Sequence, residues 1–303
     1  MKKDLLTLSE LSSDEITLIL DTADKLKSEL KEGKKHDFPS GKTLAMIFAK
    51  NSTRTRVSFE TGIFQLGGQG IFLSNTDSQL GRGEPIKDTA RVLSRYCDGI
   101  MIRTFDHEEV IELAQFSTIP VINGLTDYAH PCQVLGDLMT IREHKGRLSG
   151  LKACYIGDGN NVANSMIVGC LKCGMSVSVA CPEGYRPDAG VIDFALACGD
   201  DLFTLTDKPE LAAVGADVIF TDVWSSMGHE SQIEKRIKAF EGFQVNDTIM
   251  ALANPGCMVQ HCLPAHKGEE ITEEVFEAHA QEIFDEAENR LHVQKAVMYL
   301  LMR

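Results

Sequence analysis

The stretch that decides the fold is residues 43–56, TLAMIFAKNSTRTR, in which an apolar run is followed by the polar segment Ser52–Arg56. The apolar run predicts a buried β-strand, and the polar segment predicts the start of a helix. The first turn of a helix presents backbone N–H groups and the positive end of its dipole, which favour an anion. Here three hydroxyl groups and two guanidinium groups are added to them. The segment therefore predicts a site for a small phosphorylated ligand, unless Ser52 is an ordinary N-cap and both arginines are solvated.

Strand-like runs recur on both sides of this stretch, with helical patterns between them. The predicted strands are residues 44–48, 71–73, 99–102, 120–122, 153–156, 177–180, 202–205, 218–220 and 258–261. The predicted helices are residues 12–30, those that follow Thr53, Pro85, Glu108 and Pro131, and residues 162–171, 189–197, 209–214, 232–240 and 280–302. Such alternation predicts an α/β fold with parallel sheets flanked by helices.

The length of 303 residues is about twice that of a usual domain, so we expect two domains. The first covers residues 1–130, the second covers residues 131–284, and a helix at about 285–303 packs back onto the first. Open α/β sheets bind ligands beyond the carboxyl ends of their strands. We therefore expect the active site in the cleft between the two domains.

The formal net charge is −14 and no Lys/Arg-rich tract occurs, so nucleic acid and anionic membrane are not expected as partners. The N-terminus lacks the pattern of a signal peptide, and the protein is expected to be cytoplasmic. The nine cysteines form no regular framework and are expected to be reduced. Cys170 and Cys173 have CxxC spacing but lie in a helical pattern with no second pair nearby, so we expect no metal site.

Four further motifs follow predicted strands. Residues 157–165, GDGNNVANS, imitate a dinucleotide-binding turn without a clear third glycine, and their amide side chains also suit the orientation of a substrate. His130 and Gln133 flank a proline that begins a helix, which suits an anion or carbonyl site. Asp222 is either a ligand for a cation or an N-cap. The segment His261–His266, HCLPAH, has poor spacing for a metal or a Cys/His nucleophile, and better suits a turn that aims Cys262 at a ligand amine.

Together these motifs resemble the aspartate/ornithine carbamoyltransferase family from about Leu5 to the C-terminus. The segment 52–56 and the HPCQ motif at 130–133 mark the family as a whole. Asp222 with the SMG motif at 226–228, and HCLP at 261–264, resemble the branch that uses ornithine. Residues 79–84, QLGRGE, residues 87–91, KDTAR, and residues 289–294, NRLHVQ, also match.

The resemblance implies an enzyme that transfers the carbamoyl group of carbamoyl phosphate to the side-chain amine of ornithine, giving citrulline and phosphate. It implies a homotrimer, or a multiple of trimers, without cofactor or metal. The residues implied to bind carbamoyl phosphate are Ser52, Thr53, Arg54, Thr55, Gln79 of a neighbouring subunit, Arg103, His130, Gln133, Cys262, Leu263 and Arg290. Those implied to bind ornithine are Asn164, Asp222, Ser226, Met227, Cys262 and Leu263, and those implied in catalysis are Arg54, Arg103, His130, Asp222 and Cys262. In the family the peptide bond between Leu263 and Pro264 is cis.

Several alternatives stay open. Within the family, the acceptor could be putrescine, N-acetylornithine or aspartate, although the SMG motif favours a free amino acid and Asp222 favours an amine side chain. A nicotinamide-dependent dehydrogenase depends only on the turn at Gly157 and leaves the segment 52–56 unexplained. A binding protein without catalysis would close on its ligands and release them unchanged.

Overall fold

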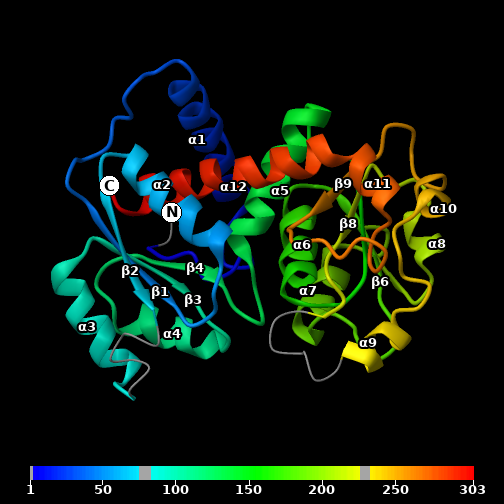
Figure 1. The fold of residues 1–303 in the computed structure, drawn as a ribbon, viewed down its shortest axis with the longest axis horizontal. Coiled ribbons are helices and arrows are strands. Elements are labelled where there is room, and N and C mark those ends of the chain that lie inside the picture. The colour runs from blue at the N-terminus through cyan, green and yellow to red at the C-terminus, as the bar shows by residue number, and fades with distance from the viewer. Residues whose placement is uncertain (1–2, 75–82, 226–232) are drawn as a thin grey trace. The chain divides into compact units, whose positions relative to one another are not determined.

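Two parallel β-sheets flanked by helices organise the chain, as the alternation of apolar runs predicts. The computed structural model describes residues 3–74, 83–225 and 233–303 (Figure 1). It divides into two compact units, the first formed by Met1–Met139 with Asn289–Arg303, and the second by Thr140–Glu288. The predicted α/β class is confirmed. The predicted domain limits near residues 130 and 285 stay predictions.

The first unit contains a four-stranded sheet in the order β2-β1-β3-β4. Its strands are β1 (Thr43–Phe48), β2 (Gln69–Ser74), β3 (Gly99–Arg103) and β4 (Val121–Leu125). Its helices are α1 (Ser13–Lys31), α2 (Thr53–Gln65), α3 (Ile86–Tyr96) and α4 (His107–Phe116). Because all pairings are parallel, the carboxyl ends of β1 and β3 lie at one edge, where Phe48 is in register with Arg103. This register places Arg103 beside the loop that connects β1 to α2.

The second unit contains a five-stranded parallel sheet in the order β7-β6-β5-β8-β9. Its strands are β5 (Lys152–Ile156), β6 (Ser176–Ala180), β7 (Phe203–Thr206), β8 (Val218–Thr221) and β9 (Met258–His261). Its helices are α6 (Asn161–Lys172), α7 (Ala189–Cys198), α8 (Pro209–Ala213), α9 (Ile233–Ala239), α10 (Asp247–Met250) and α11 (Glu273–Ala278). The register pairs Ile156 with Thr221 and Thr221 with His261, so the loops after β5, β8 and β9 begin side by side.

Helices α5 (Pro131–Lys145) and α12 (Ala280–Leu301) each contribute residues to both units. Helix α5 begins at Pro131, as predicted, and α12 confirms the long C-terminal helix. Each of the nine predicted strands overlaps an observed strand. The sequence pattern missed α10 and α11, because helices of four and six residues are too short to show a helical period.

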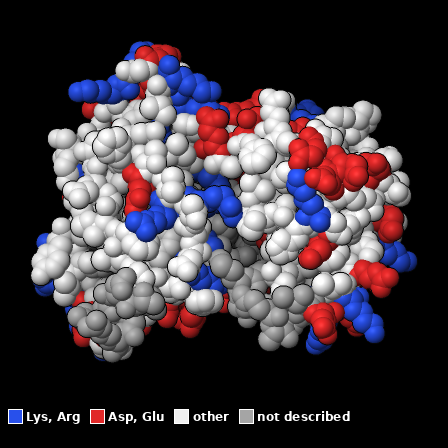
Figure 2. Space-filling model, viewed as in Figure 1, with Lys and Arg blue, Asp and Glu red and all other residues white. Residues whose placement is uncertain are grey.

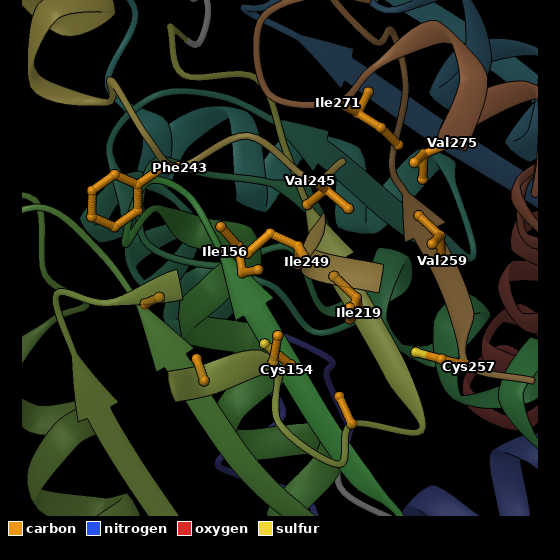
Figure 3. Close-up of a cluster of buried hydrophobic side chains, with 14 of the residues drawn as sticks. Cys154, Ile156, Ile219, Phe243, Val245, Ile249, Cys257, Val259, Ile271 and Val275 are labelled. Atoms are coloured by element: carbon orange, nitrogen blue, oxygen red, sulfur yellow. The ribbon is translucent and has the colours of Figure 1, made fainter. Parts of the chain in front are cut away.

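Apolar side chains fix the ends of the strands in the second unit. Figure 3 shows Ile156 of β5, Ile219 of β8 and Val259 of β9 converging with Ile249 and Val275 from the covering segments. These side chains are almost completely buried. Burial of such a side chain contributes about 1.5–3 kcal/mol, so this cluster stabilises the sheet from which the polar loops extend.

Charge on the surface follows the acidic composition. Figure 2 shows acidic side chains gathered over α11, whose sequence EEVFEA carries three exposed glutamates. Within the three described ranges, no helix is long and apolar enough to cross a membrane.

Candidate active site

The loop between β1 and α2 gathers polar groups around one hydroxyl. Ser52 caps α2 by accepting a hydrogen bond from the Thr55 N–H at 3.2 Å. The Thr55 Oγ1 accepts from the Ser52 hydroxyl at 3.0 Å, from Arg103 Nη1 at 3.3 Å and from Arg290 Nη2 at 3.2 Å. The predicted helix start is confirmed, and three segments of the first unit meet at Thr55.

Arg103 and Arg290 are both buried, with 6% and 5% of their surface exposed. A charge removed from water is costly unless an opposite charge or several hydrogen bonds compensate it. Two guanidinium groups beside a helix N-terminus also supply the positive charge and the fork-shaped donors that bind an oxyanion.

The two arginines of the segment 52–56 have different surroundings. Arg54 is exposed in the first turn of α2. Arg56 pairs with Glu60 at 3.0 Å and its guanidinium lies 3.7 Å from the centre of the Phe72 ring. Arg56 thus has partners, Glu60 and Phe72, within the first unit. Ser52, Thr53 and Arg54 lie at the start of α2, at the candidate phosphate site.

His130 is buried in the same unit, directly before α5. Burial holds the pKa of its imidazole well below the usual range, and the nearby charges of Arg290 and Arg103 lower the pKa further. His130 is therefore neutral at pH 7 and can donate a single N–H to a carbonyl or oxyanion without adding a full charge.

Gln133, one turn into α5, donates from Nε2 to Asp137 Oδ1 at 2.8 Å, and both side chains are buried. This bond fixes the orientation of the amide. Sequence reasoning missed Asp137, and the only signal for it was the spacing of four residues, which places the two side chains on one helix face.

In the second unit, Asp222 follows β8 and its carboxylate is held by three hydrogen bonds. Oδ1 accepts from the Val223 N–H at 2.8 Å and from the Cys262 thiol at 3.0 Å. Oδ2 accepts from Asn160 Nδ2 at 2.7 Å. The structure therefore brings together Asp222 and Cys262, which the sequence predicted as partners for an amine.

Asn160 is a site residue that sequence reasoning did not single out. Its Oδ1 accepts from the N–H groups of Val162 and Ala163, at 2.9 and 3.2 Å, and thereby caps α6. Its amide nitrogen remains for Asp222. One side chain thus joins the start of a helix to the orientation of the carboxylate.

Asn164 lies one turn further into α6 and is buried. Its Oδ1 accepts from the Asp188 N–H at 3.0 Å. The Asn164 oxygen therefore serves a bond within the protein.

The turn after β9 carries Cys262, Leu263 and Pro264. The peptide bond between Leu263 and Pro264 is cis, as the family resemblance implied, and Leu263 has a φ of 57°. Cys262, His261 and Asp222 offer possible metal-ligand atoms within 4.8 Å of one another. Both ring nitrogens of His261 already have partners, Leu263 N and Glu270 Oε1, so a metal would have to displace these hydrogen bonds.

The glycine-rich turn after β5 has a packing role. A Cβ atom on Gly159 would lie 2.2 Å from the Pro187 nitrogen and 2.3 Å from the Arg186 carbonyl carbon. The Gly159 N–H donates to the Tyr185 oxygen at 2.8 Å. Glycine is therefore required here by the close passage of residues 185–187, and the turn gives no support to the dinucleotide reading.

Three predicted site residues, Gln79, Ser226 and Met227, lie outside the described residues. The other predicted site residues fall into two groups. The first unit holds Ser52, Thr53, Arg54, Thr55, Arg103, His130, Gln133 and Arg290, and the second holds Asn164, Asp222, Cys262 and Leu263.

Comparison with known proteins gives a similar division, except that the second family model includes the C-terminal residues that pack in the first unit. The model of the aspartate/ornithine carbamoyltransferase carbamoyl-P binding domain matches residues 3–143, and that of the Asp/Orn binding domain matches residues 149–301. The ornithine carbamoyltransferase of Pelobacter propionicus is 54% identical over 302 residues, covering 100% of this chain and 99% of the relative.

Two solved structures extend the match. The ornithine carbamoyltransferase from Pyrococcus furiosus has a TM-score of 0.93 and 52% identity, covering 99% of this chain and 96% of that chain. The anabolic ornithine carbamoyltransferase from Campylobacter jejuni has a TM-score of 0.92 and 44% identity, covering 99% of both chains. The chain belongs to the aspartate/ornithine carbamoyltransferase family.

Proposed function

We propose that this chain transfers the carbamoyl group of carbamoyl phosphate to the side-chain amine of L-ornithine, giving L-citrulline and phosphate. The choice of ornithine as the acceptor depends on one observation, the Cys262 thiol lying 3.0 Å from Oδ1 of Asp222. A carboxylate beside a thiol favours an amine and repels the carboxylate of an aspartate side chain. The full-length relatives with 50–55% identity carry the name of the same activity.

The first unit binds carbamoyl phosphate in this proposal. Ser52, Thr53, Arg54 and Thr55 hold the phosphate, because the start of α2 supplies N–H groups, hydroxyls and the positive end of the dipole. Arg103 and Arg290 add buried positive charge beside Thr55. The family resemblance also assigns Gln79 of a neighbouring subunit to this phosphate.

The carbamoyl end is bound by Arg103, His130 and Gln133. Neutral His130 and charged Arg103 donate hydrogen bonds to the carbonyl oxygen. Donors that are already in place stabilise the negative charge that develops on this oxygen without reorganisation.

The second unit binds ornithine. Asn164, Asp222, Ser226 and the Met227 backbone hold the amino-acid group, while Cys262 and the Leu263 carbonyl receive the side-chain amine. Cys262 and Leu263 are also assigned to carbamoyl phosphate. The turn that contains them must lie beside both the amine and the carbamoyl carbon that the amine attacks.

The reaction then needs no covalent enzyme intermediate. The neutral side-chain amine attacks the carbamoyl carbon, the carbonyl oxygen becomes an oxyanion, and expulsion of phosphate restores the carbonyl. The Cys262 thiol, which Asp222 orients, and the Leu263 carbonyl hold the amine, and the departing phosphate accepts its proton. Arg54, Arg103 and His130 contribute most where negative charge develops.

Three wider assignments belong to this proposal. The assembly is a homotrimer, or a multiple of trimers, in which Gln79 reaches a neighbouring subunit's site. The compartment is the cytoplasm. The pathway is arginine biosynthesis, and the Campylobacter jejuni relative is described as anabolic.

The test is incubation of the purified protein with carbamoyl phosphate and, in turn, ornithine, putrescine, N-acetylornithine and aspartate. With ornithine we expect carbamoylated product and phosphate in equal amounts, at a kcat/KM at least about 100-fold above that of the other amines. Another acceptor would lose a hydrogen bond to a charged group and would leave a buried charged group without its partner, and each of these costs about 1–3 kcal/mol. A preference for another acceptor, or phosphate release without product, would contradict the proposal.

A further inference from the structure

The turn that carries Cys262 and Leu263 is held by a buried pair, His261 and Glu270. His261 is the last residue of β9, and both side chains are fully buried. His261 Nδ1 lies 2.9 Å from the Leu263 nitrogen, and Nε2 lies 3.0 Å from Glu270 Oε1. One imidazole therefore connects the backbone of the turn to a carboxylate nine residues away.

These contacts determine where the imidazole carries its proton. The Leu263 N–H can only donate, so Nδ1 must be the unprotonated nitrogen. The proton then lies on Nε2 and is donated to Glu270. Both ring nitrogens of His261 are thus engaged, which suits a role in orientation.

Glu270 also closes the far end of the turn. Its Oε1 accepts from the His266 N–H at 2.6 Å, in addition to the His261 ring. The other oxygen, Oε2, has no hydrogen-bond partner among the described residues. A single carboxylate oxygen therefore fixes both the start and the end of the segment 261–266.

The backbone between these ends needs such support. Leu263 has a φ of 57°, a left-handed conformation that a residue with a Cβ adopts at a cost of about 1–2 kcal/mol. The bond to His261 Nδ1 lies on this residue. It sets the direction of the Leu263 peptide groups, and the neighbouring Cys262 thiol reaches Asp222 at 3.0 Å.

We propose that His261 and Glu270 are positioning residues that hold Cys262 and the Leu263 carbonyl in the orientation that receives the amine of the acceptor substrate. This inference rests on the proposed function, because the amine is that of ornithine. It adds two residues to the site, which act through the turn and do not touch the substrate. Their loss impairs the use of ornithine more than the binding of carbamoyl phosphate, because most residues assigned to carbamoyl phosphate lie in the first unit.

The first test uses two substitutions at Glu270. Glu270→Gln retains a carbonyl oxygen for both hydrogen bonds and places its amide nitrogen where Oε2 has no partner. Glu270→Leu removes both bonds. We expect Glu270→Leu to lower kcat/KM for ornithine at least about 10-fold, since two hydrogen bonds are lost, and Glu270→Gln to stay within about threefold of wild type.

The second test uses two substitutions at His261. The Oδ1 of an Asn lies at the same branch as Nδ1 of His, so His261→Asn keeps an acceptor for the Leu263 N–H but is too short to reach Glu270. His261→Leu keeps neither. We expect His261→Leu to resemble Glu270→Leu, and His261→Asn to lie between it and wild type.

Glu269 provides the matched control, because it neighbours Glu270 in sequence but its Oε2 lies 3.5 Å from Nδ1 of a different histidine, His266, and both of these side chains are exposed. Glu269→Leu should leave kcat/KM for ornithine and Kd for carbamoyl phosphate within about twofold of wild type. Calorimetry with carbamoyl phosphate, measured on every variant, reports the binding of that substrate separately. Its Kd should change by a smaller factor than kcat/KM for ornithine in the His261 and Glu270 variants.

Equal losses for ornithine and carbamoyl phosphate would overturn the proposal in favour of a structural role, as would wild-type kcat/KM in Glu270→Leu. A loss in Glu270→Gln as large as that in Glu270→Leu would show that the charge matters and not the hydrogen bonds, and would also overturn it. If Glu270→Leu fails to fold, kcat/KM for ornithine is compared between His261→Asn and Glu270→Gln. A lower value in His261→Asn supports the proposal, and equal values overturn it. Absence of citrulline formation by the wild-type protein would instead refute the proposed function.

Discussion

The two units offer groups of opposite charge to a ligand. In the first unit, Arg103 and Arg290 converge on Thr55 at the start of α2, and the surroundings favour an anion. In the second unit, Asp222 lies with Cys262 and Asn160, and the surroundings favour an amine. Each sheet edge therefore suits one substrate. Variants in each unit should mainly change Kd and kcat/KM for the substrate of that unit.

The largest effect is expected from Asp222→Ala, which removes the carboxylate for the amine. Truncation of one member of a buried, hydrogen-bonded charge pair costs about 2–5 kcal/mol, so kcat/KM for ornithine should fall about 30- to 5000-fold. The measurement is steady-state citrulline formation with ornithine varied at saturating carbamoyl phosphate. An equal loss of carbamoyl phosphate affinity in calorimetry would break the comparison between the units.

Arg54→Ala tests the other unit. Loss of one charge-assisted hydrogen bond of about 1.5–3 kcal/mol should lower kcat/KM for carbamoyl phosphate about 10- to 150-fold. Activity within about twofold of wild type would rule out the phosphate role of Arg54. Arg56→Ala is the control in the same helical turn, and it should change kcat/KM less than about twofold, because Arg56 is engaged with Glu60 and Phe72.

Asn160→Ser should give a smaller loss, confined to ornithine. Serine still caps α6, but it cannot reach Asp222 with an amide donor. Asp222 keeps the Val223 N–H and the Cys262 thiol, so we expect a loss of about 0.5–1.5 kcal/mol, or about 2- to 12-fold in kcat/KM for ornithine. An unchanged thermal midpoint would show that the cap is retained, and a shift in carbamoyl phosphate binding would contradict the assignment.

The smallest effect concerns the pH dependence of stability. Because burial and two arginines lower the pKa of His130 in the folded state, the unfolded chain takes up a proton at His130 near pH 6.5 while the folded chain does not. The folded state therefore loses stability as pH falls below about 6.5, by about 1 kcal/mol between pH 7.5 and 5.5 from this group.

Urea unfolding of wild type and His130→Gln at these two pH values measures this contribution as a difference of differences. The variant should lose less stability on acidification than wild type. An identical pH dependence would show that folding leaves the pKa of His130 unchanged, which would contradict the lowered pKa on which the neutral donor is based.

Local sequence determined much of this protein. The apolar runs predict all nine strands of the described residues, because a buried parallel strand needs a short continuous apolar segment. Ser52 and Pro131 begin α2 and α5 as the pattern predicts, because caps depend on residues within one turn. The residue types at positions 52–56, 222 and 261–264 already indicated an anion and an amine as ligands.

Only the tertiary structure decided which distant side chains share a site. Thr55 is 48 residues from Arg103 and 235 residues from Arg290, and Asn160 is 62 residues from Asp222. No local pattern reports such pairs, because parallel register and helix packing bring them together. The same holds for the neutral state of His130 and for the proton on His261 Nε2, since burial and partners from other segments determine both.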